Sequence, residues 1–123
     1  MNWNKIKDKR PKAFALLGIS RGYPPPSNMS DYECGTVFEG QRLLYDFFDE
    51  QKIYVIVELE VQYTRELDED GTNPHYVPDG FYYLIHDERQ LAASGMKVYK
   101  DRSEAEADAF TDAFEILEEK LTE

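Results

Sequence analysis

The chain has one cysteine, two histidines and no long apolar run. A single cysteine excludes an internal disulfide framework, so a reducing cytoplasm is the simplest compartment for it. A membrane-spanning helix needs about 20 consecutive apolar residues, and no segment approaches that length. The first residues also lack the apolar stretch of a signal peptide. We therefore expect a cytoplasmic protein that does not associate with membranes.

Residues that bind metals or cofactors are scarce as well. Cys34, His75 and His86 are too few for a zinc site, and no paired-cysteine or paired-histidine spacing occurs. Residues 68–71 only faintly resemble a calcium loop, because the glycine comes too early for an EF-hand. Residues 18–22 match the G-x-S-x-G nucleophile pattern, but we expect a helix before them where a hydrolase has a strand. We predict neither a metal nor a cofactor.

Acidic side chains greatly outnumber basic ones outside the N-terminal segment. The net charge is −11, with +5 in the first 30 residues and −16 in the remainder. This distribution argues against direct nucleic-acid binding by the body of the domain. Two arrangements are compatible with it. The basic segment binds the chain's own acidic body or a neighbouring copy, which would give a homo-oligomer, or the acidic body meets a basic partner.

The length of 123 residues and the apolar content of 41% are typical of one globular domain, which we assign to residues 1–123. Strict alternation over residues 52–64 predicts a strand. Its core-facing residues should be Ile53, Val55, Val57, Leu59, Val61 and Tyr63. Further strands are expected at residues 81–86 and 96–100, with a long acidic loop over residues 67–74.

Apolar spacing predicts three helices. A short one should cover residues 12–17, with Pro11 near its first turn and Gly18 ending it. A loop with three consecutive prolines should cover residues 19–35. A second helix is expected over residues 37–50, where apolar side chains recur every three or four positions. This order predicts an α+β fold, in which helices pack on a small antiparallel sheet of about three strands.

The third helix, which residues 101–103 open and which runs to about residue 121, shows the clearest pattern. Ser103 and Glu106 form a capping box, which marks its start. At 100° per residue, one half of the helix is apolar and should pack on the sheet. That half consists of Ala105, Ala109, Phe110, Ala113, Phe114, Ile116, Leu117 and Leu121. The opposite half carries an acidic stripe, Glu104, Asp108, Asp112, Glu115 and Glu119, which should face solvent or a partner.

Three stretches of the chain resemble known small proteins. They are Trp3 in the basic N-terminus, residues 42–49 running into 52–55, and residues 99–106 at the start of the last helix. In these stretches the chain resembles uncharacterised small α+β proteins encoded by bacteriophages and mobile elements. The resemblance implies a small sheet with a late helix and is compatible with an accessory or host-inhibiting role. It implies no known activity, so it assigns no functional residue.

Our first functional hypothesis is a non-catalytic protein-interaction domain. Charge is segregated and aromatic residues are plentiful, whereas no nucleophile, base and orienting group occur together. The predicted contact residues are Glu104, Asp108, Asp112, Glu115 and Glu119 on the last helix and Glu66, Asp68, Glu69 and Asp70 on the acidic loop.

Two alternatives remain open at this stage. The acidic rows have about the spacing of DNA phosphates, so the domain could be a nucleic-acid mimic that inhibits a basic DNA- or RNA-binding protein. The chain could also be a small enzyme. Glu58 and Glu60, on one face of a strand, would then serve as acid and base, or Cys34 would pair with His86.

Overall fold

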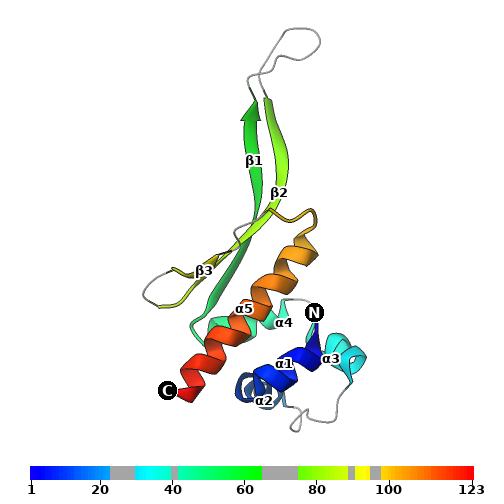
Figure 1. The fold of residues 1–123 in the computed structure, drawn as a ribbon, viewed down its shortest axis with the longest axis vertical. Coiled ribbons are helices and arrows are strands. Elements are labelled where there is room, and N and C mark those ends of the chain that lie inside the picture. Colours follow the sequence, from blue (N-terminus) through cyan, green and yellow to red (C-terminus); the bar gives the residue numbers. More distant parts are fainter. Residues whose placement is uncertain (23–29, 40–41, 65–74, 89–90, 95–97) are drawn as a thin grey trace.

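The computed structural model describes residues 1–22, 30–39, 42–64, 75–88, 91–94 and 98–123. The elements follow one another as α1 (Trp3–Lys9), α2 (Pro11–Ser20), α3 (Asp31–Phe38), α4 (Leu43–Glu50), β1 (Tyr54–Thr64), β2 (His75–His86), β3 (Leu91–Ser94) and α5 (Arg102–Thr122) (Figure 1). The predicted α+β class is therefore confirmed. Within the described residues, no helix is long and apolar enough to cross a membrane.

The sheet is built around the long antiparallel pair β1 and β2. Their register runs from Tyr54 opposite His86 to Thr64 opposite His75. The short strand β3 pairs with the other edge of β2, which leaves β1 at the edge of the sheet. The strand predicted at residues 96–100 is not confirmed. Residues 95–97 lie outside the described ranges, and Tyr99 forms only an isolated bridge with Phe81.

Strand β2 is longer than predicted because it runs through Pro78 and Gly80. The register shifts between Glu60 and Val61, which leaves Asp79 as an extra residue on β2. Such a bulge is where a strand tolerates proline. Gly80 has φ of 140°, and a Cβ there would lie 2.6 Å from the Tyr99 carbonyl oxygen. Only glycine therefore allows the chain at Tyr99 to approach β2 closely enough for the bridge.

Helix α5 lies along one face of the sheet and α4 packs beside it on β1, whereas α2 packs on α5 with α1 and α3 next to it (Figure 1). Ile53 and Ile85 are fully buried on this covered face and Val55 is nearly so, whereas Tyr54, which points the other way, is 37% exposed. The prediction of core-facing residues in β1 holds at Val55 and in part at Val57, while Val61 and Tyr63 lie outside the side chains that the structure describes. Leu59 is on the covered side yet 44% exposed, because the far part of β1 and β2 extends beyond α5.

Helix α5 occupies the predicted range but differs from the prediction in two details. Its N-cap is Asp101, with no side-chain cap hydrogen bond, so the expected capping box of Ser103 and Glu106 is wrong. Leu121 is 38% exposed, because it lies in the last turn, beyond the buried positions of the helix. The other predicted apolar residues are buried, apart from Ile116, which is partly buried.

The N-terminal half contains more helix than the sequence indicated. Helix α1 was not predicted, and α2 continues past Gly18. The predicted loop over residues 19–35 is wrong at both ends, because α2 reaches Ser20 and α3 begins at Asp31. Residues 23–29, with the three prolines, lie outside the described ranges. The helix predicted over residues 37–50 is two helices, and Arg42 before α4 is left-handed, with φ of 67°.

Aromatic packing joins these helices to α5. Trp3 is fully buried, with ring centroids 6.0 Å from Phe14, 5.5 Å from Phe38 and 5.7 Å from Phe114. The Trp3 amide also donates a hydrogen bond to Asp31 at the start of α3, at 2.7 Å. The basic N-terminal segment is therefore anchored in the core of the domain by its one tryptophan.

Candidate functional site

The acidic stripe of α5 is largely engaged within the chain. Asp112 accepts a hydrogen bond from the Tyr83 hydroxyl, and Asp108 accepts one from the Tyr99 hydroxyl at 2.7 Å. Glu115 forms an ion pair with Arg10, with nitrogen and oxygen 3.4 Å apart. Glu104 and Glu119 are exposed. Three of the five contact residues predicted on α5 therefore already have partners, which are Tyr83, Tyr99 and, in the basic N-terminal segment, Arg10.

The two tyrosines bonded to α5 form a polar layer between helix and sheet. Their ring centroids are 6.0 Å apart, and both rings are buried. Burial, followed by the hydrogen bond to Asp108, raises the pKa of Tyr99 to about 12. Burial also raises the pKa of Tyr83, and the hydrogen bond to Asp112 adds to that rise. Both hydroxyls therefore stay protonated at neutral pH and act as donors that fix the helix on the sheet.

Glu118 was missed by the sequence analysis. Its carboxylate accepts hydrogen bonds from the backbone N–H of Ala13 at 2.7 Å and of Lys12 at 3.3 Å. It thus caps the N-terminus of α2, which has no side-chain cap of its own. The local sequence of α2 could not reveal a cap that comes from a residue about 105 positions later.

The predicted enzyme residues are not assembled into a site. Glu58 accepts a hydrogen bond from the exposed hydroxyl of Tyr82 at 2.7 Å, and Glu60 follows it on the same open face. Cys34 is fully buried in α3, and burial raises the pKa of its thiol, which disfavours a thiolate. His86 ends β2, and Lys7, Asp31 and Glu33 supply the charges felt by Cys34.

The serine of the G-x-S-x-G match is not on a nucleophile elbow. Ser20 is the last residue of α2, and its hydroxyl donates to the Leu17 carbonyl at 2.9 Å. Among the described residues, no group of three or more histidine, cysteine or acidic side chains is placed to hold a metal. The predicted contact residues Glu66, Asp68, Glu69 and Asp70 lie outside the described ranges, as does the faint calcium-loop match.

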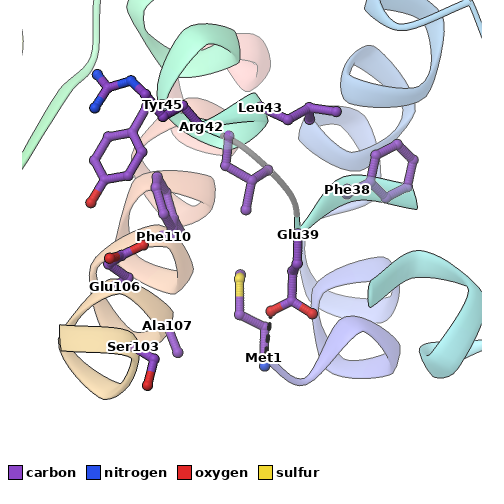
Figure 2. Close-up of a pocket in the computed structure, with 11 residues that line it drawn as sticks. Met1, Phe38, Glu39, Arg42, Leu43, Tyr45, Ser103, Glu106, Ala107 and Phe110 are labelled. Atoms are coloured by element: carbon purple, nitrogen blue, oxygen red, sulfur yellow. Dashed lines mark hydrogen bonds and ion pairs between the residues drawn. The ribbon is translucent and has the colours of Figure 1, made fainter. Parts of the chain in front are cut away.

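A cavity of about 290 Å³ opens between the N-terminus, the end of α3, the start of α4 and the first turns of α5 (Figure 2). The Met1 ammonium and Glu39 form an ion pair at its edge, 3.3 Å apart. The remaining lining residues are Phe38, Arg42, Leu43, Leu44, Tyr45, Ser103, Glu106, Ala107 and Phe110. This lining, as described, holds no histidine or cysteine, and its polar groups are the Met1 ammonium, Glu39, Arg42, Tyr45, Ser103 and Glu106.

Tyr45 forms the wall between this cavity and a second one. Its ring packs edge-on against Phe110, with centroids 4.9 Å apart, and the Arg42 guanidinium lies 4.9 Å from its centroid. Burial, followed by the charge of Glu106, raises the pKa of the Tyr45 hydroxyl. The hydroxyl is therefore neutral near pH 7, and the wall is a packed aromatic surface with an arginine held against it.

The second cavity is a groove of about 420 Å³ along β1, which we call the β1 groove. It is lined by Arg42, Tyr45, Val55, Ile56, Val57, Arg102 and Glu106. Arg102 closes one side of it. The guanidinium of Arg102 donates to the Val57 carbonyl at 3.3 Å and lies 4.9 Å from the Phe81 ring centroid. The groove therefore combines an apolar strand surface with two arginines and one glutamate.

The edge of β1 that borders this groove carries outward backbone groups. Phe81 exchanges both of its backbone hydrogen bonds with Tyr99, on the side of β2 away from β1. Its register partner Leu59 must therefore direct its own N–H and C=O away from β2. Val57, two residues along, has the same orientation, in agreement with the Arg102 bond to its carbonyl.

Comparison of the chain with protein-family models, with curated proteins and with solved structures finds no match.

Proposed function

We propose that this domain acts without catalysis, by binding a protein partner through the β1–β2 ribbon, the hairpin formed by strands Tyr54–Thr64 and His75–His86. The observation that carries the proposal is the extension of this ribbon beyond the helices (Figure 1). Its exposed apolar residue Leu59 lies where α5 no longer covers the sheet. An isolated two-stranded hairpin is marginally stable in water, so a ribbon of this kind gains stability from a bound partner.

The charge of the ribbon favours a basic partner. Glu58 and Glu60 lie on its uncovered face, together with Tyr54 and Tyr82. The sequence between the two strands adds four acidic residues, Glu66, Asp68, Glu69 and Asp70, against Arg65. Within a body of net charge −16, this acidic end would steer a basic protein toward the ribbon. We place the domain in the cytoplasm on the sequence argument given above.

The rival functions have less support. A nucleic-acid mimic built on the α5 stripe would have to compete with the contacts that Asp108, Asp112 and Glu115 already make within the chain. A homo-oligomer held by the basic N-terminal segment competes with the contact between Arg10 and Glu115. An enzyme would need Glu58 and Glu60 in a concave site, and neither residue lines the cavity or the β1 groove.

Site-specific photo-crosslinking tests the proposal. A photoreactive phenylalanine at Leu59 should form a covalent adduct with one protein when the full chain is illuminated in a lysate of the organism that encodes it. The same group at Glu119, an exposed residue of the last helix, is the matched control. Adduct formation at Leu59 should fall with added salt, because a basic partner is attracted by charge. Adducts formed only at Glu119, or equally at both positions, would refute binding through the ribbon.

A further inference from the structure

We infer that the partner binds as an added strand along the free edge of β1, through an extended segment in which basic and apolar residues alternate. This inference rests on the proposed function and specifies its binding mode. Strand addition uses main-chain hydrogen bonds for affinity and alternate side chains for specificity. The edge between Val57 and Leu59 meets both requirements, since its backbone groups point outward and the β1 groove lies beside it.

The other edge of the ribbon is not available for such pairing. Phe81 is bonded to Tyr99 there, and β3 pairs with β2 at Leu84 and Ile85. Farther out on β2, Pro78 has no N–H to donate. By contrast, the only contact described at the edge of β1 near Val57 is the side-chain hydrogen bond from Arg102. At the level of Val57 and Leu59, a partner strand can therefore add to β1, whereas the opposite edge on β2 is already paired.

The Arg102 guanidinium donates to the Val57 carbonyl, which is the bond that a backbone N–H of an added strand would otherwise make. The bond is 3.3 Å long, at the long end of hydrogen-bond distances, and Arg102 is exposed. An exposed contact of this kind contributes little stability, so a backbone N–H can replace it. In the free protein the same contact covers part of an edge that would otherwise be open to non-specific pairing.

Charge on the two faces of β1 defines the chemistry of the added strand. On the uncovered face, Glu58 and Glu60 favour a lysine or arginine at the positions opposite them. On the groove face, Val55 and Val57 favour apolar side chains. The two arginines there, Arg42 and Arg102, outnumber the one glutamate, Glu106, and so disfavour basic side chains. A one-residue slip would exchange the two faces, so the charges also fix the register.

The same charges disfavour a second copy of this chain as the occupant. A second β1 would bring its own Glu58 and Glu60 to the acidic face, where the complementary residues are basic. Charge complementarity therefore favours a basic protein over self-pairing.

Titration with synthetic peptides, followed by backbone amide NMR, tests the inference. The probe is a capped peptide of about nine residues that alternates lysine with valine. It should shift the amides of Val57 and Leu59 most. Two control peptides should not bind: one of the same composition with lysines and valines in separate blocks, and one with glutamate in place of lysine. Shifts centred on Glu104 and Glu119 instead, or equal shifts with the block peptide, would show simple charge attraction and overturn the inference.

Two variants make the result specific to the edge. Val57→Pro removes an outward N–H that is not part of the β1–β2 pairing, and should weaken binding by about tenfold or more. If that variant does not fold, a second variant tests binding along β1. It carries Glu58→Lys together with Glu60→Lys on the uncovered face. It should abolish binding of the lysine peptide and create binding of the glutamate peptide. Unchanged binding by either folded variant would refute strand addition.

The two tests separate the mode of binding from the function. A partner crosslinked at Leu59 whose binding survives Val57→Pro and the charge reversal would keep the proposed function and eliminate strand addition. Peptide binding at β1 without any crosslinked partner would leave a functional edge but refute the proposed cellular role.

Discussion

Substitution of Tyr83 by phenylalanine is the most direct test of how α5 is held on the sheet. The Tyr83 ring is 5% exposed, and its hydroxyl donates to the carboxylate of Asp112 in the middle of α5. The substitution keeps the ring and removes only the donor. Asp112 then keeps its charge at a partly buried position with one hydrogen bond fewer.

The expected loss of stability in Tyr83→Phe is set by the charge on the Asp112 carboxylate, which accepts the hydrogen bond. A hydrogen bond to a charged group contributes about 1.5–3 kcal/mol, whereas a neutral pair contributes about 1 kcal/mol. Because Asp112 is only partly buried, water will replace some of the lost interaction. We therefore expect Tyr83→Phe to lower the free energy of unfolding by about 1.5 kcal/mol, equivalent to about 5 °C in Tm for a domain of this size.

The measurement is the urea-denaturation midpoint of the parent and of Tyr83→Phe at pH 7. The matched control is Tyr82→Phe, which removes the hydroxyl that bonds Glu58 on the exposed face. The control should leave the midpoint unchanged, because both groups stay hydrated. Equal midpoints for the parent and Tyr83→Phe would refute the assignment of Asp112 to the helix–sheet contact.

Alkaline pH gives an independent measure of the same contact. The folded pKa of Tyr83 is raised above the ordinary value of about 10, and that of Tyr99 is raised to about 12. The stabilisation is complete below pH 10 and is lost above it, because the unfolded state releases its protons first. Each tyrosine should lower the stability by about 1.4 kcal/mol per pH unit between about pH 10 and 12. In Tyr83→Phe, the loss of unfolding free energy per pH unit should be smaller by the contribution of one tyrosine. An identical loss per pH unit in both proteins would contradict this assignment.

Three further substitutions test the contacts of α5 by denaturation midpoints. Glu118→Ala should cost about 1 kcal/mol, because the backbone N–H groups of Lys12 and Ala13 lose their acceptor; no loss would mean that water replaces the cap. Ser103→Ala should leave the midpoint unchanged, since α5 is capped at Asp101 without a side-chain bond; a drop would restore the capping box. Leu117→Asp should abolish cooperative folding, because it buries a charge at a position that is 2% exposed, and a Tm near that of the parent would refute its placement.

Periodicity predicted the elements whose packing is local and regular. The alternation in β1 and the apolar half of α5 each recur over several turns or residue pairs, so they identified a strand and a helix within a few residues. Periodicity failed where one residue decides the outcome. The helix over residues 37–50 breaks before α4, where Arg42 adopts a left-handed conformation that is uncommon for a residue other than glycine.

Contacts between distant segments were beyond the reach of local sequence patterns. The bridge between Phe81 and Tyr99 depends on Gly80, which lies just before the strand predicted at residues 81–86. The outward edge of β1 depends in turn on that bridge, because it sets which residues point away from β2. No property of Val57 in the sequence indicates that its carbonyl accepts a hydrogen bond from Arg102, the first residue of a helix 45 positions later.

The acidic stripe shows why a helical wheel alone could not identify the contact surface. On the wheel, Asp112 projects about 20° from the buried Ala105, at the boundary between the two halves of α5. A carboxylate at such a boundary is within reach of the sheet, and it becomes structural if a hydroxyl faces it. The strand register supplies Tyr83, and the approach of the chain at Gly80 supplies Tyr99 for Asp108. Glu115 is ion-paired with Arg10 as well, so three carboxylates of the stripe have contacts within the chain, and this structural role is one reason why we propose the ribbon as the contact surface.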